Sequence, residues 1–198
     1  MSDEIDPVRE LRPDRRRPAE PATTNALSRQ KVALMATIAE GTDLGAGVRH
    51  DPAMYPRLAY VDEVVALDYL TRVFGFTERR EERMGTGAPD DPMLAWLDFG
   101  DGVVMIGRAD GACHEVHRIY SPAEVGHATA MINVRVHDID SHYRRAVEAG
   151  ALVTMPLEDA FYGFRRYEAN DPEGNRWHFH ESFADIRARG GTVDQDGS

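Results

Sequence analysis

"RLAYVDEVVALDYLTRVFGF" (residues 57–76) and "INVRVHDIDSHYRRAVEAGA" (residues 132–151) repeat the same order of features, and this repetition decides the fold. Each stretch begins with a short apolar strand pattern, reaches an aspartate (Asp62 or Asp138) and continues with the apolar spacing of an amphipathic helix. An aspartate between a strand and a helix is typical of an N-cap, because its carboxylate accepts hydrogen bonds from free backbone N–H groups. The chain therefore contains one structural unit twice.

The two units also end alike. Each helix pattern stops at a glycine, Gly75 or Gly150, and extended segments separated by turn residues follow. These segments are "MLAWLDFGDGVVMIGR" (93–108) in the first unit and "ALVTMP" (151–156), "YGFRRYEA" (162–169) and "NRWHFHES" (175–182) in the second. We predict two βαβββ modules, at about 54–110 and 128–183, which pair because one helix covers only one face of a four-stranded sheet.

The chain on either side of the modules has a different composition. Residues 1–50 begin with a stretch rich in Pro, Arg, Asp and Glu and contain a short helix pattern at 26–41. We expect a disordered tail, the short helix and a linker there, a domain at 51–185, and a flexible C-terminal tail at 186–198. The helix is either an appendage that docks on the domain or on a partner subunit, or it has a specific regulatory or targeting role.

Composition limits the possible partners. The formal net charge of −11 argues against nucleic acid and anionic membranes, since both attract basic surfaces. A single cysteine, Cys113, excludes an internal disulfide framework and is typical of a reducing compartment. No apolar run approaches the roughly 20 residues that cross a bilayer. We therefore expect a cytoplasmic protein with no membrane or nucleic-acid partner.

With its two modules, a V-x-D strand-to-helix junction and its "DPEGNRWHF" stretch (171–179), the chain resembles the vicinal oxygen chelate superfamily. This superfamily includes glyoxalases, extradiol dioxygenases and the fosfomycin- and bleomycin-resistance proteins, and the likeness is greatest to its glyoxalase-like branch. The resemblance covers roughly residues 54–183. It implies an α+β fold in which two βαβββ modules form a curved mixed sheet around a cavity, and it leaves the chemistry open.

The resemblance also implies where a metal would bind. Metal-using members carry His or Glu on the first and last strands of each module. Those positions fall here on Tyr55, Met131, either Met105 or Ile106, and His178. Only His178 is a competent ligand, whereas a divalent site needs three or four converging donors. We predict no metal and no other cofactor, with a divalent metal as the alternative.

Strand alternation and the resemblance together predict a ligand site. In "NRWHFHES", the large apolar residues Trp177 and Phe179 alternate with His178 and His180, so the two histidines share the polar face. The residues that the same parity places on the cavity face are Tyr55, Arg57, Met131, Asn133, Arg135, Arg176, His178 and His180. Arginines there suit carboxylate or phenolate oxygens, unless they extend to solvent or pair with the many acidic residues.

Other reactive residue types offer weaker patterns. Cys113 and His117 have a spacing that two metal ligands can use, but the stretch supplies no second pair, and a nucleophilic Cys113 would need an activating base. Glu168, Glu181 and Asp98 are candidate general bases by residue type alone.

Three functions remain open. The favoured one is a metal-free small-molecule-binding protein of the glyoxalase and bleomycin-resistance type, which binds or transforms an anionic or aromatic metabolite or antibiotic. Non-catalytic binding is preferred to lyase, isomerase or dioxygenase-like activity. The second is a metal-dependent lyase, isomerase or dioxygenase that recruits other donors, among them His178, His180, Glu181 and His127. The third is an interaction module built on the N-terminal helix. We also expect a homodimer.

Overall fold

A computed structural model of the chain describes residues 52–111 and 113–193. The expected tail, helix and linker in residues 1–50 lie outside the described residues, as do the last five residues of the expected C-terminal tail.

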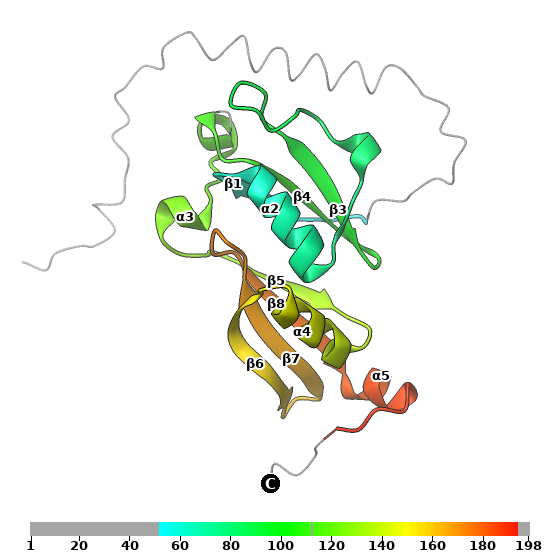
Figure 1. Ribbon diagram of the computed structural model, residues 1–198. Helices are drawn as coiled ribbons and strands as arrows, with labels where there is room; N and C mark the ends of the chain where they lie inside the picture. The colour runs from blue at the N-terminus through cyan, green and yellow to red at the C-terminus, as the bar shows by residue number, and fades with distance from the viewer. Residues whose placement is uncertain (1–51, 112, 194–198) are drawn as a thin grey trace, which may run out of the picture. The chain divides into compact units, whose positions relative to one another are not determined.

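The first module is a four-stranded sheet with one helix across it (Figure 1). Its strands are β1 (Arg57–Tyr60), β2 (Thr77–Glu78), β3 (Leu94–Phe99) and β4 (Gly102–Arg108). The order across the sheet is β1-β4-β3-β2, with β1 parallel to β4 and the other pairs antiparallel. Its helix is α2 (Glu63–Tyr69), which continues as the π-helical turns of η2 (Leu70–Phe74), and a 3₁₀ turn η3 (Arg80–Glu82) follows β2.

The second module repeats this arrangement after a linker that contains η4 (Cys113–His117) and α3 (Pro122–Val125). Its elements are β5 (Met131–Arg135), α4 (Ile139–Glu148), β6 (Leu152–Ala160), β7 (Phe164–Asn170) and β8 (Arg176–Ser182). The strand order β5-β8-β7-β6 matches that of the first sheet, with β5 parallel to β8. The predicted pair of βαβββ modules is therefore confirmed.

The strand-to-helix junctions contain the aspartate N-caps, and the first helix ends at the glycine, as the sequence predicted. The side chain of Asp62 accepts a hydrogen bond from the N–H of Val65, and Asp138 accepts one from Ser141, so both aspartates are N-caps. Gly75 ends the first helix with φ +81°, a left-handed conformation that most other residues adopt at a cost.

A shared core holds the two modules together. Phe74, at the end of η2, packs at 5.7 Å from Trp177 and 5.0 Å from Phe179 on β8, measured between ring centroids. All three side chains are fully buried. The apolar side of each module therefore contributes to one continuous core, as expected for modules that cannot bury their sheets alone.

The domain continues beyond the expected boundary at residue 185. Helix α5 (Phe183–Ala188) follows β8 directly, and its Phe183 and Ile186 side chains are buried. Arg189, just after the helix, forms an ion pair with Glu181 at 2.9 Å. An apolar pair three residues apart anchors this short helix, which extends past the predicted boundary at residue 185.

In the part of the chain that the structure describes, no helix has the length and apolar character needed to span a bilayer.

Candidate functional site

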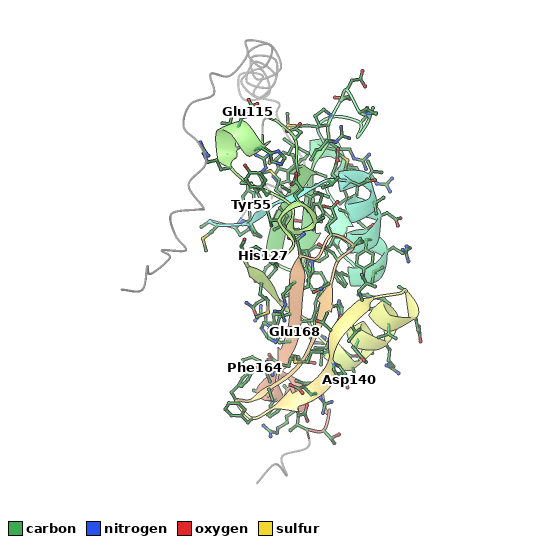
Figure 2. The ribbon with its side chains drawn as sticks, turned by 90° about the vertical axis from the view of Figure 1, so that its left-hand side faces the viewer. Tyr55, Glu115, His127, Asp140, Phe164 and Glu168 are labelled. Atoms are coloured by element: carbon green, nitrogen blue, oxygen red, sulfur yellow. The ribbon has the colours of Figure 1, made fainter. Side chains whose placement is uncertain are left out.

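The second sheet has one apolar and one polar face. Trp177 and Phe179 of β8 are buried on the side of α4, whereas His178 and His180 belong to the opposite face. Figure 2 shows Phe164 and Glu168 of β7 on one side of this sheet and Asp140 of α4 on the other. We call the side away from α4 the open face; it carries Met131, Asn133, Arg135, Glu158, Phe164, Arg166, Glu168, Arg176, His178 and His180.

His178 is the most enclosed polar side chain of the open face, with only 8% of its surface exposed. Its Nδ1 lies 2.8 Å from the side-chain oxygen of Asn133, its register partner on β5. Because an amide oxygen only accepts hydrogen bonds, Nδ1 must carry the proton, and Nε2 keeps a free lone pair. Nε2 is buried and has no hydrogen-bond partner. His178 therefore presents an unsatisfied acceptor.

The environment keeps this imidazole neutral. Burial lowers the pKa of His178, and the neighbouring His180 lowers it further. Burial also lowers the pKa of His180, whose ring stacks on that of His178 at 5.4 Å with an interplanar angle of 26°. The edge of Phe164 meets His180 at a centroid distance of 5.4 Å. Two neutral imidazoles and one phenyl ring thus form a continuous group.

The cations of the open face already have anionic neighbours. These pairs are Arg166–Glu158 (2.9 Å), Arg176–Glu168 (2.6 Å) and Arg135–Asp101 (3.6 Å). Arg135 and Asp101 are both largely exposed, so their pairing is weak, whereas the other two pairs have hydrogen-bond geometry. The sequence left open whether these arginines extend to solvent or pair with acidic residues. In the structure, all three have an acidic partner.

The structure does not join all the predicted ligand-binding residues into one group. Asn133, His178 and His180 are in contact, but Tyr55 and Arg57 lie in the first module. Arg57 reaches Cys113 instead, with Nη2 at 3.9 Å from Sγ. Within residues 52–111 and 113–193, no hydrogen bond, ion pair or ring contact connects Tyr55 or Arg57 with the histidines. Their role at a ligand site stays a prediction.

The metal positions implied by the resemblance can be tested on the strands. Met105 pairs with Arg57 on the face away from α2, whereas Ile106 is fully buried in the core, so Met105 is the relevant position. Tyr55, Met105 and Met131 cannot replace His or Glu as ligands of a divalent metal, which leaves His178 alone. Among the described residues, no group of three or more His, Cys, Asp or Glu side chains could hold a metal ion. The residues present therefore do not fit the metal site of the superfamily.

The alternative metal donors do not converge either. Glu181 faces the α4 side of the sheet, opposite to its strand neighbours His178 and His180. Its carboxylate accepts the N–H of Ile139 and pairs with Arg189. The suggestion that Glu181 joins the histidines is wrong, because strand alternation separates them.

The remaining candidate groups have structural partners. Cys113 is buried, and burial raises the pKa of its thiol, so it remains protonated at neutral pH. Glu168 pairs with Arg176, and Asp98 pairs with Arg79 at 2.8 Å. These contacts give no sign of an activated nucleophile or a free general base.

Two features were missed by sequence reasoning. A cavity of about 1430 Å³ lies between the modules, where Asp101 and Arg135 approach each other and where Asp138 and Arg145 also line the wall. Arg135 alone among the predicted ligand-binding residues lines it. The second feature is the aromatic stretch "FYGF" (161–164), whose rings continue the histidine group; its composition was a usable signal.

Comparisons with known proteins agree with this architecture. The family model described as Glyoxalase/Bleomycin resistance protein/Dioxygenase superfamily matches residues 61–179. An uncharacterized protein of Mycobacterium bovis is 29% identical over 128 residues, which cover 64% of this chain and 81% of that protein.

Solved structures give the same result. The crystal structure of TioX from Micromonospora sp. ML1 is 33% identical, with a TM-score of 0.50, and the match covers 66% of this chain and 96% of TioX. A family enzyme from Burkholderia phytofirmans PsJN shares the fold at 20% identity and a TM-score of 0.50, covering 65% of this chain and 96% of that one. The family model spans more than half of the chain and includes both strand-to-helix aspartates, Asp62 and Asp138, and the strand with the two histidines up to Phe179. The chain therefore belongs to the Glyoxalase/Bleomycin resistance protein/Dioxygenase superfamily.

Proposed function

We propose that this protein binds a small molecule on the open face of its second sheet, without using a metal. The observation that carries the proposal is His178: an almost buried, neutral imidazole whose Nε2 lone pair has no partner. A buried acceptor without a hydrogen bond costs about 1–3 kcal/mol, so a ligand that donates an O–H or N–H to it recovers this free energy. Asn133 fixes the tautomer that leaves Nε2 as the acceptor.

Binding is proposed in preference to catalysis. The family includes bleomycin resistance proteins, which supports a small-molecule ligand. The candidate general bases Glu168, Glu181 and Asp98 are all engaged with arginines, and His178 is the single competent ligand among the implied metal positions. Nε2 is also covered by neighbouring groups, so ligand entry requires a side chain of the open face to move. Arg176, whose side chain is half exposed and lies two residues along the same strand, is the proposed mobile group.

A homodimer is part of the proposal. Phe161 at the turn between β6 and β7 is fully exposed, and Met131 at the start of β5 is 43% exposed. Uncovered apolar side chains of this size beside a ligand face support coverage by a second copy of the chain.

Thermal-shift screening of metabolites and antibiotics tests the proposed function, because a ligand of the native state raises its melting temperature. We expect at least one compound with an O–H or N–H donor to stabilise the wild-type protein. The His178→Ala variant should lose this stabilisation, whereas His117→Ala, which changes an exposed linker histidine, should keep it. Equal stabilisation of all three proteins would refute a ligand site at His178.

A further inference from the structure

Five rings form a chain from the tip of the β6–β7 turn to the unpartnered histidine. We call this group the aromatic strip: Phe161, Tyr162, Phe164, His180 and His178. Successive centroids are 5.2, 6.0, 5.4 and 5.4 Å apart in that order. Each spacing lies in the range of direct ring contact, with edge-to-face contacts at Phe161–Tyr162 and Phe164–His180 and a stacked pair at His178–His180, so the strip is a chain of touching rings rather than one flat surface.

The strip runs from the surface to an almost buried end. Phe161 is fully exposed and Tyr162 is 46% exposed, whereas His178 is only 8% exposed. The guanidinium of Arg166 lies 5.2 Å from the centre of the Tyr162 ring and helps to hold that ring in place. Exposed aromatic rings offer apolar faces to a flat molecule. The buried part of the strip holds two imidazole nitrogens without a hydrogen-bond partner, Nε2 of His178 and Nδ1 of His180.

Two of the three arginines beside the strip are closely paired, which disfavours an anionic ligand. The third, Arg135, is the register partner of His180 and has only a weak, exposed pairing with Asp101. Arg166 and Arg176, the arginines on β7 and β8, are engaged with Glu158 and Glu168, so an anion would have to compete with these carboxylates. The imidazoles of the strip have lowered pKa values and carry no charge at neutral pH. An anion would therefore gain no uncompensated cation from these groups, whereas a neutral molecule loses little on leaving water.

We propose that the ligand is a neutral planar aromatic molecule with one O–H or N–H group on its ring system. This inference rests on the proposed function and narrows it. The ring system lies against Tyr162 and Phe164, and its O–H or N–H donates to Nε2 of His178. Phe164 and His178 are separated by two successive ring spacings of 5.4 Å, a span suited to a molecule of two or three fused rings.

Three matched probes test this selectivity by equilibrium dialysis against the full-length protein. 2-Naphthol has the planar rings and a neutral donor, 2-methoxynaphthalene lacks the donor, and 2-naphthoate is anionic. We expect 2-naphthol to bind about tenfold more tightly than either of the others, since the hydrogen bond to a buried acceptor is lost or replaced by an uncompensated charge.

Substitutions in the strip test where the rings bind. Tyr162→Leu and Phe164→Leu should each weaken 2-naphthol binding about three- to tenfold, because leucine keeps apolar bulk but removes stacking. Tyr120→Leu, which changes a similarly exposed tyrosine in the linker, should leave the affinity unchanged. Circular dichroism and thermal unfolding verify that each variant is folded.

The outcomes separate this inference from the proposed function. Tighter binding of 2-naphthoate would overturn the neutral character of the ligand, and ligands from the thermal-shift screen that are aliphatic yet lost in His178→Ala would overturn its aromatic character. Both outcomes would keep a ligand site at His178. Failure of His178→Ala to affect any ligand would overturn both. If the two leucine variants change the mass in light scattering and leave 2-naphthol binding unaltered, the strip is a subunit contact and the inference is wrong.

Discussion

The hydroxyl of Tyr60 donates a 2.7 Å hydrogen bond to Oδ2 of Asp171, and this bond joins the first strand of one module to the last turn of the other. Both residues are buried. Asp171 also accepts hydrogen bonds from the indole N–H of Trp177 and from the backbone N–H groups of Glu173 and Asn175. Burial raises the pKa of Asp171, while these donors oppose the rise. The "DPEGN" turn therefore also links the two modules through hydrogen bonds of Asp171.

Removing this carboxylate should destabilise the domain strongly. Asp171→Ala leaves several buried donors unpaired at once, so we expect the free energy of unfolding to fall by at least about 3 kcal/mol. Tyr60→Phe removes one donor and leaves the others in place, and should cost about 1 kcal/mol. Urea unfolding measures both. Asp90→Ala, in an exposed loop, serves as the control and should change stability little. An equally small effect of Asp171→Ala would show that this carboxylate does not stabilise the contact between the modules.

His142 should make stability depend on pH. Its Nε2 donates to the carbonyl of Phe74 at 3.0 Å, and its Nδ1 accepts from the hydroxyl of Tyr167 at 2.8 Å. Burial lowers the pKa of His142 to about 4. Between that value and the unfolded pKa of about 6.5, the unfolded chain binds the extra proton, so stability falls as the pH decreases, by about 1.4 kcal/mol per pH unit for this group.

The comparison of two variants isolates that dependence. His142→Gln should be less stable at pH 7 but should lose less stability between pH 6.5 and 4 than the wild type does. His137→Gln, at an exposed position, should retain the wild-type slope. The raised pKa of Asp171 contributes with the opposite sign in all three proteins and cancels in the comparison. The free energy of unfolding is measured by urea unfolding at each pH. If it changes equally with pH in His142→Gln and in the wild type, His142 is not responsible for the dependence.

Metal removal should have no effect on stability. Since only His178 among the implied positions can ligate a metal, we expect elemental analysis of protein purified without a tag to find no stoichiometric Zn, Fe, Mn or Ni. EDTA should leave the melting temperature unchanged. A stoichiometric metal that is lost in His178→Ala would contradict the metal-free proposal.

The features that the sequence predicted well are local ones. Asp62 and Asp138 cap helices because the backbone groups they bind are only three residues away along the chain. The alternation of Trp177 and Phe179 with the histidines likewise needs only the period of a strand. The same alternation places Glu181 on the face opposite to His178 and His180, so it argues against Glu181 as a metal donor alongside them.

The features that could not be predicted depend on distant segments meeting in space. The pairing of Arg135 with Asp101 and the cavity beside it require the placement of one module against the other. The contact of Arg57 with Cys113 joins residues that are 56 positions apart. No periodicity in the sequence encodes these distances, so charge and residue type alone left the partners of the arginines open.

The proposed homodimer has a direct measurement. Light scattering at micromolar concentration should give about twice the chain mass of 22.1 kDa. The mass should fall toward that of one chain on dilution if the interface is of modest size. A strict monomer across the concentration range would contradict this part of the proposal.

Asn133 should control the hydrogen-bonding character of His178 and therefore the pH range in which a donor ligand binds. Asn133→Ala removes the acceptor that fixes the proton on Nδ1, so either nitrogen can carry it, and we expect affinity for 2-naphthol to fall about two- to tenfold. Stability should fall by about 1 kcal/mol, because Nδ1 of the mostly buried His178 loses its hydrogen-bond partner.

Asn133→Asp gives the sharper test, because it keeps an acceptor at Nδ1 but adds a negative charge. The carboxylate favours the protonated imidazole and raises the pKa of His178. A protonated ring carries a hydrogen on Nε2 and cannot accept one from the ligand, so affinity for 2-naphthol should begin to fall at a higher pH than in the wild type. Equilibrium dialysis between pH 5 and 8 measures this shift, with Arg187→Ala as the surface control. Identical pH profiles for Asn133→Asp and the wild type would mean that Nε2 of His178 is not the acceptor in the complex.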